Sequence, residues 1–153
     1  MPGTWEPFGS TRIDPPADAA APAVPAPQAA PVPPSRREPA RGVAVITCMD
    51  ARIDPLGVLG LSLGDANVIR NAGATVSDDV LRSLHAAESL LGVRRAVLIG
   101  HTDCAGHGSD AAASAAMADG ARRIRSVMPD GFAVEAFMFD VATGALNPVQ
   151  PLH

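Results

Sequence analysis

The sequence predicts an α/β domain, built on a mainly parallel β-sheet flanked by helices and preceded by a disordered tail rich in proline and alanine. Three observations predict this. From residue 41 onward, short runs of β-branched and apolar residues alternate with segments of helical periodicity, which favours parallel strands joined by helical crossovers. Residues 1–40 carry a dense Pro/Ala tract instead. The side chains best suited to chemistry directly follow two of the expected strands.

Residues 1–40 are predicted to form the tail and residues 41–153 a single domain. The tract from Pro15 to Pro39 has few large apolar groups to offset the entropy of ordering, and its prolines lack the backbone donors that helices and sheets use. The tail is either a passive extension, which is the simpler interpretation, or an arm that binds a protein partner.

In the first half of the domain we expect two strands and two helices. Residues 42–47 and 67–70 are predicted strands, and the second leaves through Asn71, Ala72 and Gly73. Residues 55–61 suit a short helix capped by Asp54. A long helix runs from a Ser77 cap to residue 91 and ends at Gly92. Its predicted apolar face is formed by Val80, Leu81, Leu84, Ala87, Leu90 and Leu91.

The second half continues the alternation. Residues 95–100 are a predicted buried strand, residues 111–128 an alanine-rich helix, and residues 133–140 a further strand. A turn at Thr143-Gly144 then leads into a last strand at 146–149. In parallel sheets, functional side chains usually lie just beyond the carboxyl ends of the strands. We therefore expect the reactive residues where strands 42–47 and 95–100 end.

Composition excludes two classes of protein. The net charge is −4 and the basic residues are scattered arginines, so the stripe of positive charge that nucleic-acid binding needs is absent. No run approaches about 18 apolar residues, so no membrane span is expected. The start of the chain lacks a secretory signal, which favours a reducing, cytoplasmic location. There the two cysteines more often bind metal or react than form a disulfide.

The first reactive cluster is Cys48-Met49-Asp50-Ala51-Arg52. In an extended segment, residues two apart point to the same side, so Cys48, Asp50 and Arg52 would share a face. A thiolate suits a metal, and a guanidinium can hold a carboxylate by a bidentate pair. A buried structural cysteine beside a surface ion pair would give the same pattern.

The second cluster is His101-Thr102-Asp103-Cys104. His-x-x-Cys presents an imidazole and a thiolate to one ion, and three protein ligands with an open fourth position mark a catalytic zinc site. Together the clusters predict a Zn²⁺ site at Cys48, His101 and Cys104. A disulfide between the two cysteines is the structural alternative.

Three blocks, CMDAR, GDANVIRNAGA and HTDCAG, resemble the signature blocks of β-class carbonic anhydrases in order and approximate spacing. The resemblance extends from Val43 to Val149. It implies zinc ligands at Cys48, His101 and Cys104, a catalytic Asp50–Arg52 dyad, and a dimer or higher homo-oligomer.

The resemblance further implies a lyase that hydrates carbon dioxide reversibly to bicarbonate and a proton through a zinc-bound hydroxide. Asn71, Ala72 and Gly73 are expected to line its substrate site. His107 is either a proton shuttle or a loop histidine without a role.

Two departures from the family pattern stand out. Ala105 replaces the usual glycine after the second cysteine, which would strain a loop that needs a left-handed residue there. The stretch from Cys104 to Phe139 is also short. Two alternatives therefore remain: a weakly active or inactive zinc-binding homologue used in assembly or partner binding, and a hydrolase of carbonyl sulfide or carbon disulfide.

Overall fold

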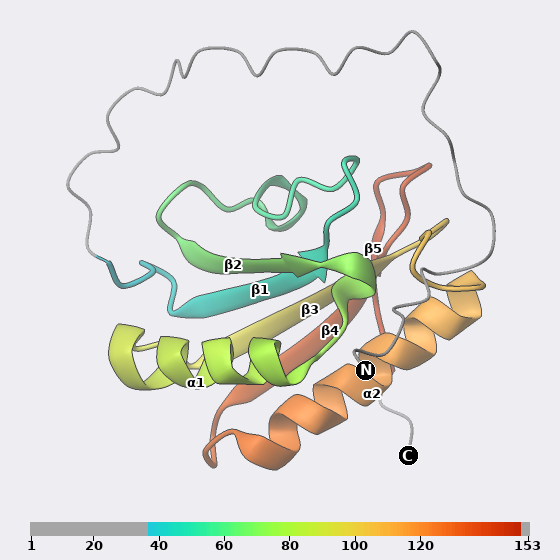
Figure 1. The fold of residues 1–153 in the computed structure, drawn as a ribbon. Helices are drawn as coiled ribbons and strands as arrows, with labels where there is room; N and C mark the ends of the chain where they lie inside the picture. The colour runs from blue at the N-terminus through green and yellow to red at the C-terminus, as the bar shows by residue number, and fades with distance from the viewer. Residues whose placement is uncertain (1–36, 151–153) are drawn as a thin grey trace, which may run out of the picture. The chain divides into compact units, whose positions relative to one another are not determined.

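A computed structural model describes residues 37–150, so the predicted tail lies almost wholly outside the described residues. These residues form five strands, two α-helices and two 3-10 turns (Figure 1). Along the chain they are β1 Val43–Cys48, η1 Gly57–Leu59, β2 Ala66–Asn71, η2 Ala72–Ala74, α1 Asp78–Leu91, β3 Arg95–His101, α2 Asp110–Val127, β4 Ala133–Phe139 and β5 Leu146–Pro148.

The strands form one sheet in the order β2-β1-β3-β4-β5. The first four are parallel, and β5 runs antiparallel to β4 after the turn predicted at Thr143-Gly144. This confirms the mainly parallel sheet flanked by helices. The central strands β1 and β3 are adjacent, so their carboxyl ends meet at one edge.

Both α-helices pack on the same face of the sheet (Figure 1). Alternate residues of β1, β3 and β4 point to that face and form the main core with the helices. Its members include Ile46, Leu98, Ala136, Leu84, Met117 and Ile124. The other face has a smaller apolar cluster, formed by Val43, Val45, Val97 and Ile99 with partly buried residues from the segment around η1 and from β4 and β5.

The caps of α1 agree with the sequence. Ser77 accepts a hydrogen bond from the Val80 amide at 3.3 Å, and Gly92 adopts the left-handed conformation that ends the helix. In α2, Ser109 accepts from the Ala112 amide at 3.1 Å. No helix within residues 37–150 has the length and apolar character needed to cross a membrane.

Two local expectations were wrong. The helix predicted at 55–61 is a single 3-10 turn. Asp54 accepts from the Leu56 and Gly57 amides at its start, and the left-handed conformation of Gly60 ends it. Leu90, predicted on the apolar face of α1, is exposed. At 3.6 residues per turn it lies about a quarter turn from the stripe of Val80, Leu84 and Ala87 that contacts the sheet.

Candidate metal centre

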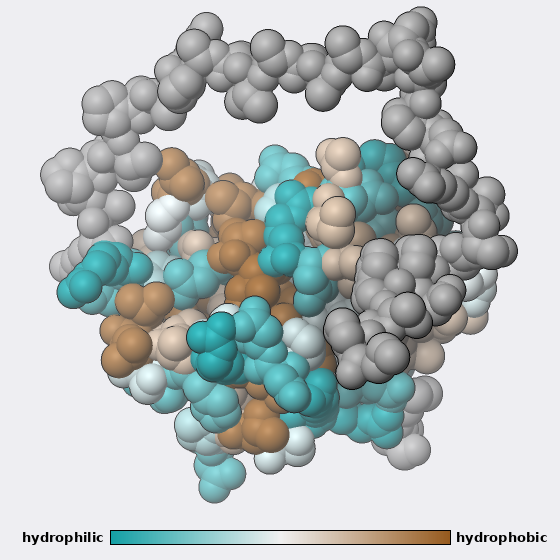
Figure 2. Space-filling model, viewed as in Figure 1, coloured by the Kyte–Doolittle hydropathy of each residue, from teal (hydrophilic) through white to brown (hydrophobic). Residues whose placement is uncertain are grey.

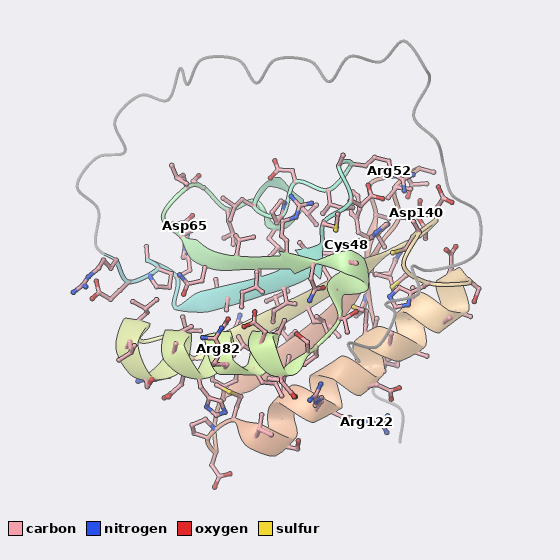
Figure 3. The ribbon with its side chains drawn as sticks, in the orientation of Figure 1. Cys48, Arg52, Asp65, Arg82, Arg122 and Asp140 are labelled. Atoms are coloured by element: carbon pink, nitrogen blue, oxygen red, sulfur yellow. The ribbon has the colours of Figure 1, made fainter. Side chains whose placement is uncertain are left out.

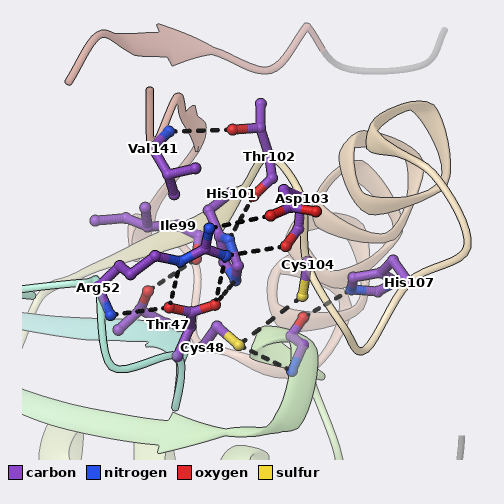
Figure 4. A network of polar contacts seen from close by, with 12 residues as sticks. Thr47, Cys48, Arg52, Ile99, His101, Thr102, Asp103, Cys104, His107 and Val141 are labelled. Carbon is purple, nitrogen blue, oxygen red and sulfur yellow. Dashed lines mark hydrogen bonds and ion pairs between the residues drawn. The ribbon is translucent and has the colours of Figure 1, made fainter. Parts of the chain in front are cut away.

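Three buried side chains meet where β1 and β3 end. Cys48 is the last residue of β1 and His101 the last of β3, and Cys104 follows in the loop toward α2. Their ligand atoms all lie within 4.8 Å of one another. Cys48 and Cys104 approach each other while His101 lies against them from the neighbouring strand (Figure 4). The parallel register of β1 and β3 brings these residues together as predicted.

The sulfur separation distinguishes a metal site from a disulfide. The Sγ atoms of Cys48 and Cys104 are 3.9 Å apart, and both cysteines are free. A disulfide requires about 2.05 Å. Two thiolates at about 2.3 Å from one tetrahedral zinc would be about 3.8 Å apart. The distance therefore fits two ligands of a common ion, and the disulfide alternative does not hold in this structure.

The imidazole of His101 is prepared to act as a ligand. Its Nδ1 lies 2.8 Å from the Thr102 carbonyl oxygen, which can only accept, so Nδ1 carries the hydrogen. The Nε2 lone pair is then free. This buried Nε2 has no hydrogen-bond partner among the described residues. A carbonyl that orients a histidine in this way is the usual support for a metal-binding imidazole.

The surroundings of Cys104 disfavour its thiolate form. Burial raises the pKa of the Cys104 thiol above its ordinary value, and the nearby Cys48 raises it further. A bound divalent ion reverses this effect, because coordination deprotonates a thiol. Two sulfurs and one imidazole nitrogen in a buried cluster are a ligand set that suits zinc.

Asp50 and Arg52 form a tight pair, but not in the way the sequence suggested. The chain turns after Met49 rather than staying extended, so the shared face expected for Cys48, Asp50 and Arg52 does not arise from strand geometry. The turn instead lets the Arg52 amide donate to Asp50 Oδ1 at 2.9 Å. The Arg52 guanidinium donates to Oδ1 at 3.0 Å and to Oδ2 at 2.9 Å.

This pair has an electrostatic consequence. Hydrogen bonds from the Arg52 side chain and amide hold the pKa of the Asp50 carboxyl well below its ordinary value. The carboxylate is therefore a permanent acceptor near neutral pH. Its Oδ2 lies 3.8 Å from His101 Nε2, so the carboxylate borders the site formed by Cys48, His101 and Cys104.

Two further residues organise the site and were missed from the sequence. Asp103 accepts from Arg52 through its carboxylate and through its carbonyl, both at 3.0 Å, and links the two reactive loops (Figure 4). Arg70 donates to the carbonyls of Cys48 and Asp50 at 2.9 and 2.8 Å. A charged residue inside a predicted strand was the only signal for Arg70. Asp103 lay inside the second predicted cluster, but no local pattern signalled its contact with Arg52 or its left-handed backbone conformation (φ 53°).

The segment Asn71-Ala72-Gly73 lies beside the cluster. Gly73 donates its amide hydrogen to Cys48 Sγ at 3.4 Å. The Asn71 side chain is occupied within its own loop, where it bonds to the amide and carbonyl of Thr75 at 2.8 and 2.7 Å. The loop is therefore held firmly against the first cysteine. Cys48 and Arg52 are labelled together in Figure 3, at the edge of the sheet where the strands end.

A hollow of about 760 Å³ lies elsewhere, among Arg41, Arg94, Leu59, Leu61 and Phe137. Arg41 and Arg94 precede β1 and β3, Leu59 ends η1, Leu61 follows it, and Phe137 lies within β4, whereas the two cysteines lie at and beyond the carboxyl ends of β1 and β3. This hollow is therefore separate from the site formed by Cys48, His101 and Cys104.

A profile described as carbonic anhydrase matches residues 43–145, which span both reactive loops and every strand up to β4. The chain belongs to the β-carbonic anhydrase family. β-Carbonic anhydrase 1 of Mycobacterium tuberculosis is 36% identical over 146 aligned positions, which cover 79% of this chain and 86% of that protein. The solved carbonic anhydrase of Streptococcus mutans has a TM-score of 0.67 and 30% identity, covering 74% of this chain and 84% of that one.

A second group of relatives carries another activity in its name. Carbon disulfide hydrolase of Saccharolobus solfataricus is 39% identical over 64 residues, which cover 42% of this chain and 31% of that protein. Ala105, at which the sequence led us to expect backbone strain, does not have a positive φ. The strain expected there is absent, because the left-handed position of the loop falls on Asp103 instead.

Proposed function

We propose that this protein catalyses the zinc-dependent, reversible hydration of carbon dioxide to bicarbonate and a proton, a lyase reaction. The observation that supports this most is the convergence of Cys48, His101 and Cys104, with a buried His101 Nε2 that lacks any other partner among the described residues. The relative from Mycobacterium tuberculosis, which aligns with most of this chain, is named as a β-carbonic anhydrase.

Cys48, His101 and Cys104 would hold the metal through two sulfurs and one nitrogen. Three protein ligands leave one tetrahedral position for a small molecule. When bound, zinc supplies the Lewis acidity that ionises a water molecule at neutral pH. The Thr102 carbonyl keeps His101 in the tautomer that this arrangement requires.

Asp50 would act as the hydrogen-bond acceptor for the attacking water, and thereby orient its lone pair toward the carbon of carbon dioxide. Its depressed pKa keeps it ionised for that role. Arg52 would keep Asp50 from becoming a fourth ligand, because three hydrogen bonds oppose the movement. Asn71, Ala72 and Gly73 would form the neighbouring wall of the substrate site.

Stopped-flow measurement of carbon dioxide hydration on zinc-loaded protein tests the proposal. The expected result is hydration whose rate rises with pH as the water ionises. Protein with one zinc per chain and no hydration at any pH from about 6 to 9 would rule the activity out, since that window spans the ionisation.

Carbon disulfide is a second candidate substrate, favoured by the likeness to carbon disulfide hydrolases over part of the chain. Carbonyl sulfide has the same linear shape as carbon disulfide and is a candidate substrate of the same activity. Release of hydrogen sulfide from the zinc-loaded protein measures this activity. Sulfide release faster than carbon dioxide hydration would make the hydrolase the principal function, and no release would exclude it.

We also propose that the chain forms a homodimer or a higher homo-oligomer. β2 is an edge strand among the described residues, and its Val68 is 40% exposed. Figure 2 shows apolar surface across the middle of this side of the molecule, and the exposed apolar side chains include Leu63, Val68 and Leu90. Apolar surface of this kind beside an unpaired strand edge favours association with a second copy.

A further inference from the structure

His107 makes a contact that the proposed chemistry does not use. It follows the Cys104 loop, and its Nε2 lies 2.9 Å from the Gly73 carbonyl oxygen (Figure 4). A carbonyl only accepts, so Nε2 carries the hydrogen and donates it. A proton shuttle needs a ring whose nitrogens are free to exchange protons, and one nitrogen of this ring is already engaged.

Gly73 connects His107 to the metal cluster. Its carbonyl accepts from His107, and its amide donates to Cys48 Sγ at 3.4 Å. Gly73 has a φ of 74°, in the left-handed region. The backbone orientation of Gly73 therefore decides whether its amide points at the Cys48 sulfur. His107 restrains that orientation through its hydrogen bond to the Gly73 carbonyl oxygen.

The two loops approach so closely that neither Gly73 nor Gly106 has room for a side chain. A Cβ added to Gly73 would lie 2.9 Å from His107 Nε2. A Cβ added to Gly106 would lie 3.1 Å from Gly73 Cα and 3.2 Å from its nitrogen. The backbone of the Cys104 loop thus packs directly on the loop that contacts Cys48, and His107 completes the contact.

We propose that His107 is a positioning residue: by holding the Gly73 carbonyl, it keeps the Gly73 amide on the Cys48 thiolate and so tunes the metal centre. This inference rests on the proposed metal site. An N–H···S hydrogen bond withdraws electron density from a thiolate. Partners of this kind, one step removed from the metal, typically change metal affinity or activity by about 10- to 100-fold.

The test uses full-length protein loaded with Co²⁺, whose thiolate-to-cobalt charge-transfer absorption reports on sulfur directly. His107→Leu removes the donor and should move the band to longer wavelength, because the sulfur becomes more electron-rich. It should also weaken metal binding by about 10- to 100-fold. His107→Gln places an amide donor near the position of Nε2 and should restore both properties. His85→Leu, at an exposed histidine of α1, is the matched control and should change neither.

The outcomes separate this inference from the proposed metal site. If the wild-type protein shows no thiolate-to-cobalt band, the metal site itself is wrong. If the wild type shows the band and His107→Leu shifts only the melting temperature, His107 is merely structural and the inference fails. The inference also fails if His107→Gln behaves like His107→Leu.

Should His107→Leu not fold, wild-type protein loaded with an NMR-active cadmium isotope decides the hydrogen bond. Scalar coupling between cadmium and the Gly73 amide proton is then expected, and its absence overturns the inference.

Discussion

The Asp50 carboxylate receives three hydrogen bonds from Arg52 and lies 3.8 Å from the imidazole nitrogen that faces the metal cluster. The pair thus combines a permanent acceptor with a restraint on its position. Arg52 also bonds to Asp103, so the same guanidinium joins the loop after β1 to the loop after β3. A single side chain therefore connects the acceptor with Asp103, which lies between the proposed ligands His101 and Cys104.

Asp50→Asn tests the acceptor role. The amide is nearly isosteric but carries no negative charge, so we expect the hydration rate to fall by about 100- to 10,000-fold, the range for loss of a general acid or base, with zinc content unchanged. Stopped-flow kinetics and metal analysis measure both. Asp103→Asn is the matched control, because Asp103 is the other carboxylate that Arg52 contacts and it is exposed. Similar losses in both variants would contradict a special role for Asp50.

The hydrogen bonds from Arg52 depress the pKa of Asp50. The carboxylate is therefore already ionised at any pH above about 3.9, the ordinary pKa of an aspartate, and it stays ionised as the pH rises. A pH dependence of the hydration rate between about 6 and 9 cannot then arise from Asp50. We expect that in Arg52→Gln the Asp50 carboxyl signal, followed by carbon NMR, titrates at higher pH than in the wild type. An unchanged titration would show that Arg52 does not govern the ionisation of Asp50.

At the scale of elements, α2 supports the site by packing closely on the sheet. Its Gly120 is buried, and an added Cβ would lie 2.7 Å from Val76 Cγ2 and 2.9 Å from Leu98 Cδ2. Val76 follows the loop that contacts Cys48, and Leu98 belongs to β3, which ends in His101. The position of α2 is thus coupled to β3, which ends in His101, and to the segment that follows the loop contacting Cys48.

We expect Gly120→Val to lower the free energy of unfolding by about 1–3 kcal/mol, the usual cost of overpacking a core. Ala115→Val places the same side chain on an exposed position of α2 and should cost about 0.5 kcal/mol through helix propensity. Urea unfolding of zinc-loaded protein at one protein concentration compares them. Equal costs would show that the close approach at Gly120 is not tight.

Over the whole molecule, one side of the sheet carries the helices, and β2 pairs only with β1, so its outer edge has no partner strand within the described residues. Val68→Lys should dissociate the proposed oligomer, because a lysine on an edge strand opposes strand pairing and apolar association. Val127→Lys is the matched control, since Val127 is 41% exposed and Val68 is 40% exposed. Light scattering after gel filtration measures the mass. A monomeric wild type, or equal effects of the two lysines, would contradict the proposal.

How much the sequence could predict follows from the range of the interactions. The carboxyl ends of parallel strands all lie at the same edge of a sheet. The meeting of Cys48, His101 and Cys104 was therefore predictable from the strand assignment and the chemistry of these residues. The caps at Ser77 and Gly92 depend only on neighbouring residues in the sequence, so they were predictable as well. The contacts of Arg52 with Asp103 and of His107 with Gly73 join residues far apart in sequence through turns whose geometry no local pattern specified.

In the proposed metal centre, one zinc ion binds to two sulfurs and one imidazole and keeps a position for a small molecule. X-ray absorption at the zinc edge of the loaded protein measures this directly. This coordination gives two sulfur neighbours at about 2.3 Å and two nitrogen or oxygen neighbours at about 2.0–2.1 Å. A zinc shell without sulfur, or one made of four sulfurs, would contradict it.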